Sequence, residues 1–210
     1  MSLFLGKIHY WLYNKIQWFE SIEKEMVSLG KEKNLPVNEW TSDLYREFGM
    51  PTGGEPLENI IDTSNIHGWL QQKISNAESR HAALITKMLE ADESIKSDLE
   101  KLFTQQGKEA AQNFNGDRVN TPEDMFNAMN DFILEGMPCD RVNEVVDSSD
   151  QEFVWKATMC LHTPYWENAK GDVKNFYELR ENWIKAFVEN LNPRYTYEKS
   201  EDGLQRITVK

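Results

Sequence analysis

The spacing of apolar residues changes once along this chain, near Gly136, and this change limits the folds open to it. Before Gly136, apolar residues recur every three or four positions, whereas the segment from Phe153 to Leu161 alternates between apolar and polar residues. The first spacing is typical of amphipathic helices and the second of strands. The sequence therefore predicts an α+β protein with a helical region at 1–136 and an α+β region at 137–210, together forming one compact domain.

Five helices are expected before Gly136, because each apolar run lies between recognisable start and stop residues. Gly30 and Gly49 follow the first two runs, and Thr121-Pro122-Glu123-Asp124 is typical of a helix start. The predicted helices cover residues 3–29, 37–48, 64–88 with a weak start after Pro56, 92–114 and 121–136.

The remaining chain is predicted to form strand–strand–helix–strand–strand. The segments are 142–146, 153–161, 172–190, 194–199 and 204–209. Asp147-Ser148-Ser149-Asp150 supplies the first turn and Ser200-Glu201-Asp202-Gly203 the second.

Charge and cysteine content exclude several classes of protein. The chain has 210 residues and a formal net charge of −12, without a Lys/Arg-rich run, so nucleic-acid binding is not expected. Charged residues interrupt the apolar N-terminal segment before it could span a bilayer, so no membrane partner is expected either. The only two cysteines, Cys139 and Cys160, favour a reducing, cytoplasmic location.

The two cysteines form the first candidate site. A two-residue loop at Ser149 and Asp150 would place Cys139 opposite Cys160, close enough for shared chemistry. His162 would then face the same side as Cys160 and could activate its thiol, with Asp140 able to orient a histidine. Buried structural cysteines and a turn-forming Asp140 remain the alternative.

The second candidate is Glu78-Ser79-Arg80-His81, where the Glu-x-x-His spacing places Glu78 and His81 on one helix face. Dinuclear carboxylate proteins use this spacing, but they need the motif twice. His9 and Glu20 on the first helix could complete a site, whereas His67 lies too far along the helix to share a metal with His81. A hydrogen-bonded core histidine is the alternative, and no metal is assigned.

Aromatic residues form the third candidate, because aromatic side chains with a few polar groups often line ligand pockets. The chain has seven Trp, and an aromatic-rich core is the alternative. The expected pocket residues, together with His81, are Trp69, Trp155, Tyr165 and Trp166.

The segment "VWKATMCLHTPYWE", a following helix and the closing "NPRYTYEKSEDGLQRITVK" hairpin resemble two families in layout. One is the L-2-amino-thiazoline-4-carboxylic acid hydrolase family, and the other is the vinyl-reductase-type small-molecule-binding domain. Only Cys160 can be carried over from them, because Gly203 to Lys210 lacks the cysteine that those families often have in the last hairpin.

These observations predict a small-molecule-binding protein with an aromatic-lined pocket between sheet and helices. The alternatives are a thiol-assisted hydrolase of a small heterocyclic substrate, acting through Cys160 and His162, and a metal-binding bundle around Glu78 and His81. The sequence leaves the ligand and the oligomeric state open.

Overall fold

The computed structural model describes residues 5–210, and it divides into two compact units that alternate along the chain. Unit 1 contains the chain up to residue 96 together with residues 134–139 and 161–173. Unit 2 contains residues 97–133, 140–160 and 174–210.

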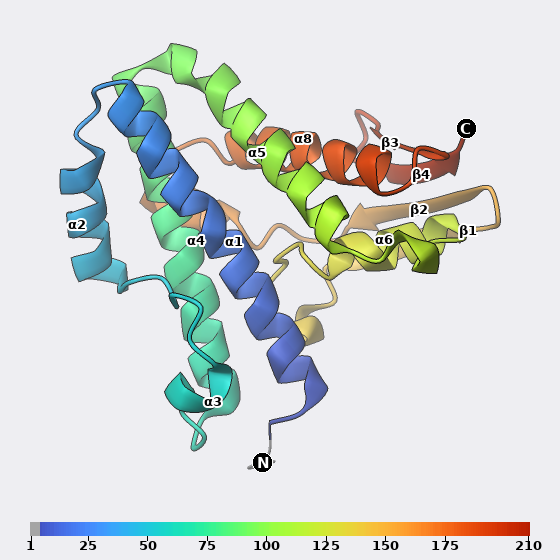
Figure 1. Ribbon diagram of the computed structural model, residues 1–210, viewed down its shortest axis with the longest axis horizontal. Coiled ribbons are helices and arrows are strands. Elements are labelled where there is room, and N and C mark those ends of the chain that lie inside the picture. The colour runs from blue at the N-terminus through green and yellow to red at the C-terminus, as the bar shows by residue number, and fades with distance from the viewer. Residues whose placement is uncertain (1–4) are drawn as a thin grey trace. The chain divides into compact units, whose positions relative to one another are not determined.

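Unit 1 is built on two long helices, α1 (Lys7–Glu32) and α4 (Ile66–Ala91), which lie side by side (Figure 1). They run in the same direction, because His9 contacts His67 near their starts and Glu20 contacts Arg80 further along. The helix α2 (Val37–Phe48) and the short α3 (Leu57–Ile60) lie on the connection between them. The 3-10 turn η1 (Glu93–Ile95) and the helix α7 (Thr163–Asn168) complete the unit.

A fully buried arginine joins three parts of unit 1. Arg80 on α4 contacts Glu20 at 2.6 Å and Glu23 at 3.0 Å, both on α1, and donates to the Gly49 carbonyl beyond α2. Glu20 also accepts hydrogen bonds from the backbone and the hydroxyl of Thr52. These partners satisfy the buried charges, which would otherwise carry a large desolvation cost.

Tyr45 on α2 lies beside the same group of charges. Burial, followed by the nearby Glu23 carboxylate, raises the pKa of Tyr45 to about 12. The phenol therefore stays neutral at ordinary pH and adds no charge to the arginine cluster.

Unit 2 contains a four-stranded antiparallel sheet and three longer helices. Its strands β1 (Asn143–Ser148), β2 (Glu152–Ala157), β3 (Tyr195–Lys199) and β4 (Gln205–Val209) have the order β1-β2-β4-β3. The helices are α5 (Lys96–Asn113), α6 (Pro122–Asn130) and α8 (Val173–Leu191), with a 3-10 turn η2 (Gly116–Arg118) between the first two.

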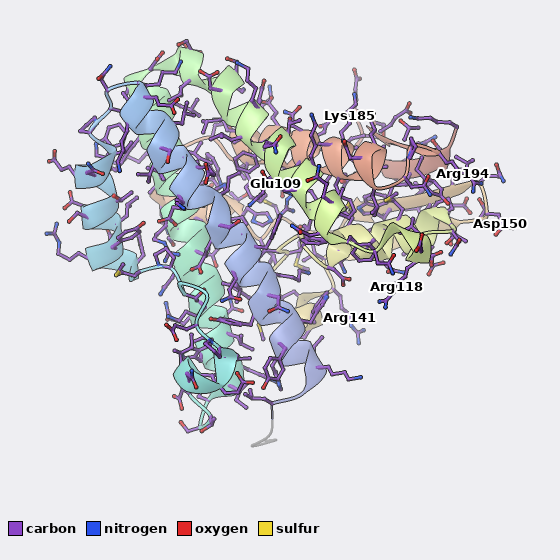
Figure 2. All side chains as sticks on the ribbon, viewed as in Figure 1. Glu109, Arg118, Arg141, Asp150, Lys185 and Arg194 are labelled. Atoms are coloured by element: carbon purple, nitrogen blue, oxygen red, sulfur yellow. The ribbon has the colours of Figure 1, made fainter. Side chains whose placement is uncertain are left out.

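Aromatic side chains form much of the core of unit 2. Phe126 on α6 lies 4.6 Å from Phe153 and 4.9 Å from Trp155, measured between ring centroids, and Trp155 continues to Tyr197. Burial raises the pKa of Tyr197, whose hydroxyl donates to Gln205. Charged side chains of the unit, among them Glu109, Lys185 and Arg194, project away from the ribbon (Figure 2).

The predicted α+β class is confirmed, since every strand among residues 5–210 lies after Val142. The Thr121 capping box is also present, with Asp124 as its reciprocal partner. However, α6 ends at Asn130 instead of Gly136, and a separate helix, α7, begins directly after His162. None of the helices among the described residues combines the length and apolar content needed to cross a bilayer.

The first hairpin differs from the predicted register. Ser148 pairs with Phe153 instead of Gln151, three residues connect the two strands, and a bulge separates Val145 from Asp147. The ladder ends with Asn143 opposite Ala157, and Cys139 lies in a 3-10 turn, η3 (Pro138–Asp140). The prediction that Cys139 stands opposite Cys160 on paired strands is therefore wrong, because proline starts a turn and cannot continue the ladder.

We expect Arg80→Met to lower the free energy of unfolding by about 3–5 kcal/mol, because it leaves the buried carboxylates of Glu20 and Glu23 without their cation. Urea unfolding followed by circular dichroism measures this change. The matched control is Arg46→Met, which removes an exposed ion pair with Asp43 and should cost about 1 kcal/mol or less. Equal effects of the two substitutions would contradict the structural importance of the Arg80 cluster.

Candidate functional site

A groove with a volume of about 420 Å³ lies in unit 1 between α2, α4 and α7. Small side chains of α4, Ser79, Ala83 and Thr86, line its floor, and the ends of α2 and α7 form its walls. The remaining lining residues are Leu44, Glu47, Phe48, Lys87, Glu90, Tyr165, Asn168, Ala169 and Lys170.

Two tight contacts hold α7 and the loop after it against α4. The Tyr165 hydroxyl lies 3.1 Å from the Ser75 hydroxyl, near the start of α7. At the other end, a Cβ added to Gly171 would collide with the Thr86 hydroxyl, so only glycine permits this approach. The wall formed by α7 therefore has a defined position along α4.

A buried histidine between two carboxylates anchors the start of α7. His162 Nδ1 lies 3.1 Å from Glu78 on α4, and its Nε2 lies 3.2 Å from Glu135. The exposed side-chain fractions are 1% for His162 and 2% for Glu78, against 12% for Glu135. A neutral imidazole carries one N–H, so two hydrogen bonds to two carboxyl groups require a second proton shared among the three residues.

This arrangement gives Glu78 a role that its spacing did not predict. The Glu-x-x-His spacing pointed to a metal, but Glu78 binds His162, and His81 is buried and stacked on Phe19 with ring centroids 4.5 Å apart. Burial of His81 is confirmed. Among residues 5–210, no group of three or more His, Cys, Asp and Glu side chains could hold a metal ion.

The histidine and glutamate of α1 that might have completed such a site have other partners. Glu20 binds Arg80, and His9 lies 3.4 Å from His67, measured between the two Nε2 atoms. The Gly6 amide donates to His9 Nδ1, so the neutral His9 ring carries its proton on Nε2 and donates it to His67. This tautomer lacks the Nε2 lone pair that a metal would need.

The predicted aromatic residues do not gather at one pocket. Tyr165 lines the groove, whereas Trp166 is fully buried beside Gly171, and Trp69 packs near Tyr13. Trp155 belongs to the aromatic core of unit 2. Phe48 and Glu47 line the groove without having been predicted, because their positions on α2 carry no motif.

Neither cysteine is in a disulfide, both are exposed, and they have different surroundings. The hydroxyl of Tyr177 on α8 donates to the Cys160 sulfur at 2.8 Å, and the Lys199 ammonium lies 5.2 Å from the Tyr177 ring. Cys139 and Asp140 lie in the 3-10 turn η3. Both ring nitrogens of His162 face carboxylates, so this residue is not arranged as the base for a thiol.

Comparison with known proteins adds no assignment: no family model matches the chain, and no curated protein or solved structure matches it significantly. The resemblance of residues 137–210 to the two families named above stays a prediction.

We expect His162→Asn to lower the free energy of unfolding by about 3–5 kcal/mol, because Glu78 and Glu135 lose the buried group that lies between them. Glu78→Gln keeps the shape of the side chain and should cost less. The control is His67→Asn, at an exposed histidine that forms a hydrogen bond with His9, so the expected change is about 1 kcal/mol or less. A loss at His162 no larger than at His67 would show that the buried triad does not anchor α7.

Proposed function

We propose that this protein binds a small polar molecule in the groove between α2, α4 and α7. The groove itself is the observation that carries the proposal, since its volume of about 420 Å³ falls within the roughly 300–1,000 Å³ of ligand pockets. Its lining combines two aromatic residues, Phe48 and Tyr165, with hydroxyl, amide and charged groups that could orient a ligand.

The buried contacts around the groove support a preformed site. The Arg80 cluster holds the residue after α2, His162 holds the start of α7, and Gly171 allows the loop after α7 to approach α4. A site held by buried contacts loses little freedom when a ligand enters, which favours affinity. This proposal places the ligand within the helical unit instead of against the sheet.

Filling the groove tests this proposal. Saturation-transfer NMR with the wild-type chain first identifies small molecules that bind. Ala83→Trp adds a large side chain to the groove floor, so it should raise the Kd of these molecules at least tenfold. Ala91→Trp is the matched control, because Ala91 is an exposed residue at the end of the same helix and does not line the groove. If every bound molecule survives Ala83→Trp unchanged, the groove is not the binding site.

Thiol chemistry at Cys160, including hydrolysis of a small heterocyclic substrate, is a second candidate function. The observation that favours it is the hydrogen bond from Tyr177, because a donor stabilises a thiolate more than a neutral thiol. The Lys199 ammonium lies over the ring of this donor, 5.2 Å from its centroid, and the exposed sulfur is accessible to a substrate.

We expect Tyr177→Phe to slow alkylation of Cys160 by iodoacetamide at pH 7 by about tenfold, since a hydrogen bond to a charged group contributes about 1.5–3 kcal/mol. Peptide mass spectrometry follows both cysteines in one experiment. Cys139 is the internal control, because it is also exposed and free, and its rate should not change. A Cys160 rate that is unaffected by Tyr177→Phe, or equal to that of Cys139 from the start, would remove the support for thiol chemistry.

Two exposed cysteines that are not in a disulfide fit the proposed location of the protein in the reducing cytoplasm. Thiols that are exposed and not bridged persist where glutathione and thioredoxin keep them reduced. This placement is part of the proposal.

A further inference from the structure

The groove between α2, α4 and α7 contains four charged side chains of balanced sign. Glu47 and Glu90 supply two carboxylates, and Lys87 and Lys170 supply two ammonium groups. None of the four forms an ion pair with another residue in the described part of the chain, 5–210. Their charges are therefore available to a ligand.

The contacts that the two walls make with α4 show at which end of the groove each charged side chain lies. At one end, the Gly49 carbonyl that follows Phe48 binds Arg80, the residue next to Ser79, and Tyr165 contacts Ser75 one turn earlier. Glu47, Phe48 and Tyr165 therefore gather near the level of Ser79.

At the other end of the groove, Gly171 packs directly on Thr86. Lys170 precedes Gly171 and Lys87 follows Thr86, so both ammonium groups belong to this end. Glu90 lies about one helical turn beyond Lys87, farther from Ser79, so this end carries two ammonium groups and one carboxylate and keeps a net positive charge.

Each end has the chemistry to hold one charge of a ligand. A carboxylate together with two aromatic rings favours a cation, by ion pairing with Glu47 and by cation–π contact with Phe48 or Tyr165. Two lysines from different elements favour an anionic group such as a carboxylate. Thr86 lies seven positions after Ser79 on α4, so the floor between them rises by about 10 Å.

We propose that the groove binds an elongated zwitterion, with its ammonium group between Glu47 and the aromatic pair and its carboxylate at Lys87 and Lys170, about 10 Å apart. This inference rests on the groove being the binding site. It explains why a chain with a net charge of −12 carries a charge-balanced groove, since neither a purely anionic nor a purely cationic ligand would satisfy both ends.

Three linear probes of one chain length test the inference by isothermal titration calorimetry. 8-Aminooctanoate carries both charges, octanedioate carries two carboxylates and 1,8-diaminooctane carries two ammonium groups. The zwitterion should bind at least tenfold more tightly than either of the others, because each of them places a like charge at one end of the groove.

Two charge-reversed variants make the test specific. Lys170→Glu should shift the preference towards 1,8-diaminooctane, and Glu47→Lys should shift it towards octanedioate, each by about tenfold relative to the zwitterion. Both residues are exposed, so the fold should be retained, and circular dichroism verifies this. Ala83→Trp should block all three probes in the wild-type background.

The possible failures of the two proposals are distinguishable. Equal binding of the three probes, or preferences that neither variant changes, would overturn the zwitterion inference. Failure of all three probes, while other small molecules bind and are blocked by Ala83→Trp, would overturn it as well but leave the groove as the binding site. If no small molecule is sensitive to Ala83→Trp, the proposed function itself fails.

Discussion

The side chain of Arg80 is completely buried, and the helical unit depends on how its charge is satisfied. Two carboxylates from α1 and the Gly49 carbonyl surround the guanidinium, while Thr52 binds the free oxygen of Glu20. A buried pair of this kind adds little net stability compared with apolar packing, but breaking it leaves charges without solvent or partners. The cluster therefore sets where α1, α4 and the end of α2 lie, because any other arrangement would leave buried charges unpaired and lower the free energy of unfolding.

The buried His162 fixes the position of α7 against α4, as Arg80 fixes the positions of α1 and the end of α2. It lies at the N-terminal cap of α7 and contacts Glu78 and Glu135, so it holds a short helix that has little stability of its own. Glu78 and Arg80 lie two residues apart on α4. Glu78 holds the start of α7 through His162, and Arg80 holds the end of α2 through the Gly49 carbonyl, so the two residues position the two walls of the groove. The polar interior of this unit specifies geometry, and the groove is a consequence of that geometry.

The candidate site could be predicted only in part, and the reason lies in how side chains meet across elements. Glu78 and Tyr165 were recognised as unusual from spacing and composition, but the partner of Glu78 is 84 residues away. Lys87, Lys170 and Glu47 look like ordinary surface charges in the sequence, and they line one groove only because α2, α4 and the end of α7 come together in the fold. The predicted pairing of the two cysteines was wrong for a local reason, because a bulge and a three-residue connection between the strands shifted the register of the ladder.

The amino-acid sequence by itself determined the order and type of most helices and strands, since periodicity, capping residues and turn residues act over a few positions. It did not determine the end of α6, the short helix α7 or the pairing register of the first hairpin. The change from helices to strands after Gly136, the Thr121 cap and the two hairpins follow from these short-range preferences. Tertiary structure decided the roles of the charged residues and the grouping of the segments into two units that alternate along the chain. Those outcomes depend on which buried charges find partners, and the partners that satisfy Glu78 and Arg80 lie 84 and 60 residues away in the chain, beyond the reach of local preferences.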